Sequence, residues 1–212
     1  YQDERSQNVY SIIDMGRAMK MPFNGLTLLD YAINTSLVIS NIAIQKHDKA
    51  GLLTFNNKIK TMLAADRRGT QMHKIMELLY NQKTGFADSN FEALNLAIKY
   101  KINQRSLILL YTNFETMDSL NRQMKYLRSI AKSHLLVVVF FENAELIKLI
   151  NKEVENTVDV YKQTVAEKFA FEKRLIVKEL KKYGIHSILA EPENLTVNSI
   201  NKYLEIKARN LL

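Results

Sequence analysis

The chain of 212 residues contains no cysteine, only two prolines and only six glycines. Without cysteine, a disulfide framework, a thiolate metal site and thiol catalysis are all excluded. The scarcity of glycine and proline leaves no low-complexity stretch, and we find no internal repeat or domain boundary. The longest apolar run, Leu135 to Phe141, is strand-sized and falls short of the roughly 18 residues that a membrane-spanning helix needs.

The sequence also lacks the short motifs of the commonest nucleotide enzymes and hydrolases. Neither G-x-G-x-x-G nor G-x-x-x-x-G-K-[ST] occurs, so both glycine-rich phosphate loops are missing. There is no G-x-S-x-G nucleophile turn. The four histidines, at positions 47, 73, 134 and 186, show no pairing at the spacing of a zinc site. These absences favour a protein that is not an enzyme.

Basic residues outnumber acidic ones by 30 to 22, which gives a formal net charge of +8. A basic surface can attract nucleic acid, an anionic membrane or an acidic protein. The lysines are spread along the chain, mostly on predicted helix faces and ends, and a mixed distribution is typical of a solvated surface. Nucleic-acid binding is therefore the alternative hypothesis for this chain, not the leading one.

Short β-branched runs alternate with longer stretches of helical periodicity, which predicts an α/β fold with three layers and a doubly wound, mostly parallel sheet. A hairpin-like turn at Asn56-Asn57-Lys58 predicts one antiparallel edge strand. The predicted strands are Val9–Ile13, Ala50–Phe55, Ile59–Leu63, Leu107–Tyr111, Leu135–Phe140 and Ser187–Ala190. The predicted helices are Leu28–Gln45, Thr70–Tyr80, Phe91–Tyr100, Met117–Ala131, Thr157–Tyr183 and a last one that opens at 194–196.

Two details of these helices bear on function. Ser89 precedes the helix Phe91–Tyr100, with Glu92 three residues further on, which fits a capping box. The helix Thr157–Tyr183 carries one apolar stripe that predicts packing on the sheet, and a smaller strip at Phe171 and Leu175 that offers a docking surface. The residues of the main stripe are Tyr161, Val165, Phe169, Ile176 and Leu180.

An acidic residue directly follows the first predicted strand, in the segment Asp14-Met15-Gly16-Arg17-Ala18-Met19. Open α/β sheets bind ligands at the carboxyl ends of their strands, so Asp14 stands at a candidate site. The register corresponds to a metal-binding loop of the form Asp-x-Ser-x-Ser. Gly16 and Ala18 occupy both serine positions, so the loop has lost two side-chain oxygens.

Four stretches together resemble the von Willebrand factor A (vWA) fold, and more closely the degenerate vWA domain of the bacterial domain-of-unknown-function family 58. They are the segment 14–19, Asp48-Lys49-Ala50-Gly51-Leu52-Leu53-Thr54-Phe55, Ser106-Leu107-Ile108-Leu109-Leu110-Tyr111-Thr112-Asn113, and Asn201-Lys202-Tyr203-Leu204-Glu205-Ile206-Lys207-Ala208-Arg209. The resemblance spans nearly the whole chain. It implies a single vWA-like domain over residues 1–212, which we expect to be a fragment of a longer protein.

In a complete vWA metal site, three loops hold a divalent cation such as Mg²⁺ through hard oxygen ligands. The resemblance places Asp14 at the first-loop Asp, Asp88 or Ser89 near the second-loop Thr, and Asn113 at the third-loop Asp, with Thr112 beside it. It therefore implies a degenerate site in which Asp14, Asp88 and Asn113 bind Mg²⁺ weakly or not at all, and no other cofactor. In the alternative, Asp14 and Asn113 hydrogen-bond loop amides at the strand ends.

Arg17 lies between Gly16 and Ala18, the two positions at which the metal-binding loop pattern has serines. Its guanidinium is predicted either to bind a partner's carboxylate or to form an ordinary ion pair with Asp88 or Glu115. The predicted partner-binding loops consist of Asp14, Gly16, Arg17, Ala18, Asp88, Ser89, Thr112 and Asn113.

The resemblance implies a non-enzymatic protein–protein interaction module. Members of that family commonly accompany MoxR-type AAA+ ATPases and are thought to act with them in chaperone-like assembly or activation of other proteins, so the implied partner is such an ATPase. The implied location is the cytoplasm, or the cytoplasmic face of the inner membrane if the full-length chain carries membrane helices. A basic vWA-like domain that binds nucleic acid is the alternative.

Overall fold

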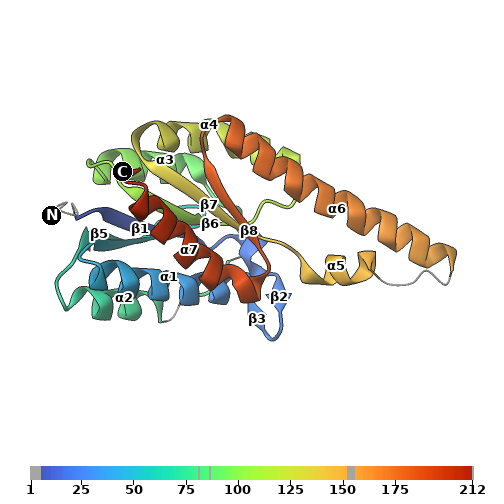
Figure 1. The fold of residues 1–212 in the computed structure, drawn as a ribbon, viewed down its shortest axis with the longest axis horizontal. Helices are drawn as coiled ribbons and strands as arrows, with labels where there is room; N and C mark the ends of the chain where they lie inside the picture. The colour runs from blue at the N-terminus through green and yellow to red at the C-terminus, as the bar shows by residue number, and fades with distance from the viewer. Residues whose placement is uncertain (1–5, 81, 86, 152–155, 212) are drawn as a thin grey trace.

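The computed structural model describes residues 6–80, 82–85, 87–151 and 156–211. Six strands form one sheet in the order β5-β4-β1-β6-β7-β8, with helices on both faces (Figure 1). Neighbouring strands are parallel except for β4 and β5, so the predicted fold class and its antiparallel edge strand are confirmed. The strands are β1 (Asn8–Asp14), β4 (Lys49–Phe55), β5 (Ile59–Asp66), β6 (Leu107–Tyr111), β7 (Leu135–Phe141) and β8 (His186–Ala190).

The helices fall into two groups, one on each face of the sheet. On one face lie α1 (Leu28–Gln45), α2 (Gln71–Leu79) and α7 (Leu195–Ala208), and on the other lie α3 (Phe91–Lys101), α4 (Met117–Ser133) and α6 (Thr157–Lys182). The described residues add four short elements that the sequence did not predict. They are the 3₁₀ turns η1 (Arg17–Lys20) and η2 (Pro192–Asn194), the hairpin β2 (Pro22–Phe23) with β3 (Leu26–Thr27), and α5 (Ala144–Ile150).

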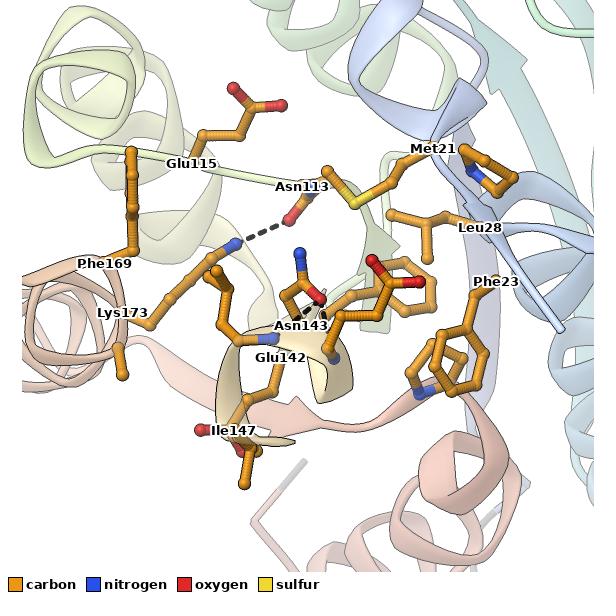
Figure 2. Close-up of a pocket in the computed structure, with 16 residues that line it drawn as sticks. Met21, Phe23, Leu28, Asn113, Glu115, Glu142, Asn143, Ile147, Phe169 and Lys173 are labelled. Carbon is orange, nitrogen blue, oxygen red and sulfur yellow. Dashed lines mark hydrogen bonds between the residues drawn. The ribbon is translucent and has the colours of Figure 1, made fainter. Parts of the chain in front are cut away.

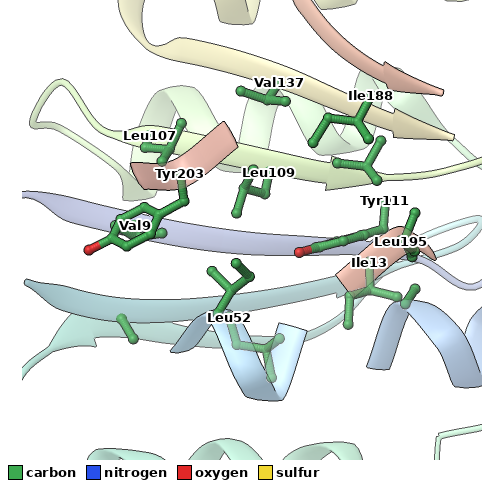
Figure 3. Packing of buried hydrophobic residues seen from close by; sticks show 14 of the residues in the cluster. Val9, Ile13, Leu52, Leu107, Leu109, Tyr111, Val137, Ile188, Leu195 and Tyr203 are labelled. Carbon is green, nitrogen blue, oxygen red and sulfur yellow. The ribbon is translucent and has the colours of Figure 1, made fainter. Parts of the chain in front are cut away.

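The core consists of two apolar clusters separated by the sheet. Side chains along a strand point alternately to its two faces, and every residue of β6 and β7 is buried, so both strands read as continuous apolar runs. Figure 3 shows one cluster, in which Leu195 and Tyr203 of α7 meet Val9, Leu107 and Tyr111 from the strands. This two-sided burial fixes the central strands, and with them the loops at their carboxyl ends.

Since β1, β6 and β7 run parallel, the loops that follow them meet at one edge of the sheet. Asp14 ends β1, Thr112 and Asn113 follow β6, and Glu142 follows β7. The turn η1 and the helix α5 come from the same loops. The fold therefore gathers residues distant in sequence at the edge where open α/β sheets bind ligands.

The helix α6 extends well beyond the sheet, with α5 beneath its first half (Figure 1). The predicted packing stripe is therefore only partly correct. Ile176 and Leu180 are fully buried, whereas Tyr161 is 72% exposed and Phe169 is 39% exposed, because no sheet lies beneath that half of the helix. Among the described residues, no helix combines the length and apolarity that crossing a bilayer would require.

Candidate functional site

The carboxylate of Asp14 is the centre of the candidate site and is almost completely buried. Its Oδ1 accepts a 2.8 Å hydrogen bond from the backbone N–H of Gly16 and another from the Ser89 hydroxyl. Its Oδ2 accepts a 2.7 Å hydrogen bond from the Thr112 hydroxyl. One carboxylate thus joins the loop after β1, the loop before α3 and the loop after β6.

Burial raises the pKa of the Asp14 carboxyl above its ordinary value, and the hydrogen bonds from Ser89, Gly16 and Thr112 oppose that rise. A buried carboxylate is costly unless donors surround it, and here the three donors come from the protein itself. The amide hydrogen bond that one hypothesis expected of Asp14 is present, at Gly16. In this geometry Asp14 links three loops through hydrogen bonds and stabilises their arrangement.

At position 16 glycine stands where the metal-binding loop pattern has a serine, and the structure shows what occupies the space of the missing side chain. A Cβ at position 16 would overlap with the Ser89 hydroxyl oxygen and would lie 3.1 Å from Oδ1 of Asp14. The space that a first-loop side chain needs is therefore filled by a hydroxyl from the second loop. Of the two second-loop residues considered, Ser89 is the one that the structure joins to Asp14.

The capping role expected of Ser89 is wrong. The N-cap of α3 is Asn90, whose side-chain oxygen accepts a 2.9 Å hydrogen bond from the backbone N–H of Ala93. The hydroxyl of Ser89 donates to Asp14 instead. A buried charged acceptor holds a hydroxyl more strongly than a helix N–H does, and the next residue is itself a good N-cap.

Arg17 and Asp88 form an ion pair at the rim of the site, with 2.7 Å between Nε and Oδ1. Both side chains are mostly exposed, at 69% and 76%. The backbone N–H of Arg17 also donates to the Ala87 carbonyl at 3.2 Å, so the pair braces the first loop against the second. The Asp88 carboxylate consequently faces Arg17 and not the cluster around Asp14.

Asn113 contacts a residue that the sequence analysis did not single out. Its Oδ1 accepts a 2.7 Å hydrogen bond from Nζ of Lys173 in α6, and its Nδ2 lies 3.5 Å from the Ala18 carbonyl oxygen, to which it donates. Lys173 is 9% exposed. Burial lowers the pKa of Lys173 to about 8, and the negative charges of Glu115 and Glu142 partly offset this decrease.

A pocket of about 390 Å³ opens beside Lys173, between the β2–β3 hairpin and the helices α5 and α6 (Figure 2). Most of its lining is apolar, and Lys173 and Asn113 are joined by a hydrogen bond within it. One feature of the sequence indicates it: Lys173 interrupts the apolar stripe between Phe169 and Ile176. The lining includes Met21, Phe23, Asn113, Glu115, Phe141, Glu142, Glu145, Ile147, Phe169 and Lys173.

The residues present do not fit a divalent cation in this arrangement. Both oxygens of Asp14 accept hydrogen bonds from protein donors, and the side-chain oxygen of Asn113 accepts one from an ammonium group. A cation that approached Asn113 would meet the positive charge of Lys173, which repels it. Among the described residues, no group of three or more His, Cys, Asp or Glu side chains could hold a metal.

Solved structures share this fold. The chain is similar to the conserved hypothetical protein BatB from Bacteroides thetaiotaomicron, with a TM-score of 0.60, 12% identity, and coverage of 96% of this chain and 100% of that one. It is also similar to an aerotolerance-related membrane protein from Bacteroides fragilis NCTC 9343, with a TM-score of 0.55, 12% identity, and coverage of 97% and 100%. The VWA domain of SpRpn10 aligns with a TM-score of 0.49, 14% identity, and coverage of 92% and 94%.

The strand order defines a doubly wound, mostly parallel α/β fold, and these two structures from Bacteroides share it. At 12% identity the similarity shows the fold alone. A scan against protein-family models and a search of curated proteins give no match. The function must therefore be argued from the site.

Proposed function

We propose that this chain is a non-enzymatic protein-interaction module that docks a partner at the carboxyl edge of its sheet without a bridging metal ion. The observation that carries the proposal is the closed hydrogen-bond set of Asp14, whose buried carboxylate accepts from Gly16, Ser89 and Thr112. A carboxylate used in this way stabilises the loops around it. Arg17 pairs with Asp88 but is 69% exposed, and we take its guanidinium as the group at this edge that contacts a partner.

The partner that we propose is a MoxR-type AAA+ ATPase, with which the chain would assemble or activate other proteins. The support is the sequence resemblance to a family whose members accompany such ATPases, together with the vWA-like fold. The proposal that no metal is needed is supported by the donor set around Asp14 and by the Lys173 ammonium at Asn113.

Affinity purification of the full-length protein from its own cells, followed by mass spectrometry, tests this proposal. We expect an AAA+ ATPase to co-elute, and the yield to be the same with EDTA as with Mg²⁺. The variant Arg17→Ala should recover less of the partner, whereas Arg105→Ala should recover as much as the wild type. Arg105 is a matched control because it is also exposed but precedes β6, at the opposite edge of the sheet.

Two outcomes would contradict the proposal. Recovery of nucleic acid and its processing enzymes, with no protein partner, would favour the nucleic-acid alternative that the net charge of +8 permits. Calorimetric titration with Mg²⁺ or Mn²⁺ that gives heat with the wild type and none with Asp14→Ala would restore a metal-dependent site. Undiminished recovery with Arg17→Ala would remove Arg17 from the interface.

A further inference from the structure

The pocket beside Lys173 is acidic although the chain as a whole is basic. Three glutamates line it, Glu115, Glu142 and Glu145, against the single ammonium group of Lys173. Glu115 and Glu145 are exposed, and Glu142 is half-buried. Since the whole chain carries a net charge of +8, this rim is a local reversal of sign, and it attracts cations from solution.

The walls of the pocket are apolar and partly open to solvent. Met21 and Phe23 come from the β2–β3 side, Ile147 and Phe169 from the α5–α6 side, and Phe141 from the end of β7. Met21 is 36% exposed and Phe169 is 39% exposed. A volume of about 390 Å³ lies within the range of about 300–1,000 Å³ in which proteins bind ligand groups.

Lys173 adds a directional group at the polar end of this apolar space. Figure 2 shows its ammonium reaching toward Asn113, with the labelled apolar side chains around it. That hydrogen bond uses one of its three N–H groups, and among the described residues no second acceptor is found for it. A buried donor without an acceptor is costly, so a carbonyl oxygen brought by an occupant would be stabilised here.

We propose that this pocket docks a partner segment in which a bulky apolar residue is flanked by lysine or arginine. This inference rests on the proposed function and names the chemistry of the partner. The apolar side chain fills the space between Phe141 and Phe169, and a backbone carbonyl accepts from Lys173. The basic flanks pair with the glutamates of the rim. An acidic segment would bring its charges against the same carboxylates, and charges of like sign across an interface oppose binding.

Three fluorescein-labelled hexapeptides test the charge and the apolar requirement separately: Lys-Lys-Leu-Phe-Lys-Lys, Glu-Glu-Leu-Phe-Glu-Glu and Lys-Lys-Ala-Ala-Lys-Lys. We expect the first to bind the full-length protein best in fluorescence anisotropy at about 150 mM salt, where distant surface charges are screened. Equal binding of the third peptide would reduce the effect to general electrostatics and overturn the proposal. Preferred binding of the acidic peptide, or no measurable binding of the first, would overturn it too.

Variants locate the binding. The double variant Glu115→Gln/Glu145→Gln should lose roughly five- to tenfold in affinity, because two exposed charge pairs disappear, and Phe169→Ala should lose a similar factor. The matched control is Glu77→Gln/Glu167→Gln, which neutralises two exposed glutamates that do not line the pocket and should bind as the wild type does. Thermal melting of all variants separates lost binding from lost folding.

The failures of the two proposals can be told apart. If affinity purification recovers a protein partner equally with the wild type and the rim double variant, the pocket proposal is wrong and the proposed function stands. If the peptides behave as expected but the wild type recovers no protein partner, the pocket proposal stands and the proposed function fails. If sedimentation shows a dimer that the rim double variant abolishes, the occupant is a second copy of the chain, which also overturns the proposal.

Discussion

At the scale of single residues, the site depends on a steric fit between Gly16 and Ser89. The glycine leaves room and the hydroxyl uses it to reach Asp14. We expect Gly16→Ala to lower the free energy of unfolding by about 1–2 kcal/mol, because the new Cβ displaces the Ser89 hydroxyl from a charged acceptor. Chemical denaturation measures this change directly.

A double-mutant cycle then tests the pairing. In a Ser89→Ala background the cost of Gly16→Ala should fall to less than half, since no hydroxyl remains to be displaced. Gly69→Ala is the control, because a Cβ there meets nothing within 4 Å. If the losses in free energy of unfolding at positions 16 and 89 are simply additive, the fit of the Ser89 hydroxyl against Gly16 does not hold the first loop in place.

The buried Lys173 side chain predicts the direction in which the free energy of unfolding changes with pH. Burial lowers the pKa of Lys173 to about 8 in the folded protein, whereas an unfolded lysine has a pKa of about 10.4. Between these values the unfolded chain binds more protons, so the free energy of unfolding should rise with pH there. Relative to Lys173→Met, which has no such proton, the wild type should gain about 2–3 kcal/mol from pH 8 to pH 10.5.

Denaturation of both proteins across this pH range is the measurement. The difference between them cancels the titration of other lysines and of the tyrosines. A difference that stays constant with pH would mean that Lys173 is solvated in the folded protein. It would also remove the buried donor on which the pocket argument draws.

The sequence could locate Asp14, and the resemblance placed Ser89 and Thr112 in neighbouring loops, but neither gave their hydrogen bonds to Asp14 or the position of Lys173. The position of Asp14 follows from the end of a strongly apolar strand, which periodicity detects. The engagement of Ser89 and the arrival of Lys173 at Asn113 depend on contacts across 75 and 60 residues of chain. No local pattern encodes such contacts, and at Ser89 the local capping pattern predicted the wrong partner.

At the scale of elements, the pocket depends on the shortest helix at this edge. The seven-residue α5 is capped by Asn143, whose side chain accepts hydrogen bonds from the backbone N–H groups of Glu145 at 2.9 Å and Leu146 at 3.4 Å. Isolated helices shorter than about 12 residues are marginal in water. We expect Asn143→Ala to cost about 1 kcal/mol and to raise amide hydrogen exchange throughout α5.

The N-cap of α6 provides the comparison. Asn156 accepts a 2.9 Å hydrogen bond from the N–H of Asp159, but α6 has 26 residues, so Asn156→Ala should speed exchange in the first turn alone. Binding of the basic apolar hexapeptide should weaken with Asn143→Ala, since Ile147 of α5 lines the pocket. Unchanged exchange in α5 would show that packing against α6, not the cap, holds it.

The same reasoning explains which elements the sequence predicted. The strands of the sheet and the long helices carry enough periodic apolar residues to be recognised. The hairpin of β2 and β3 has two residues in each strand, and α5 has seven, so neither offers a periodic signal. The helix α5 packs on α6 and the hairpin packs on α1, so each forms against a longer element, and both contribute walls of the pocket.

At the scale of the whole molecule, the net charge of +8 must be weighed against its arrangement. The basic residues are spread along the chain, and six of them among the described residues face carboxylates. Glu115, Glu142 and Glu145 gather at the pocket, where Lys173 is the only basic residue of the described lining. The ion pairs are Arg17–Asp88, Arg68–Asp66, Lys182–Glu179, Lys202–Glu205, Lys207–Asp48 and Arg209–Glu205.

This arrangement predicts weak binding to DNA, with few phosphate contacts. Non-specific affinity grows with the number of phosphates that one surface neutralises at the same time, and each contact releases counterions. Dispersed and paired lysines make few such contacts, so fluorescence anisotropy with a 20-base-pair duplex should show no binding at about 100 mM salt. Micromolar affinity at that salt, with a slope corresponding to six or more contacts, would mean that the basic residues form a continuous surface. The nucleic-acid alternative would then replace the protein-docking proposal.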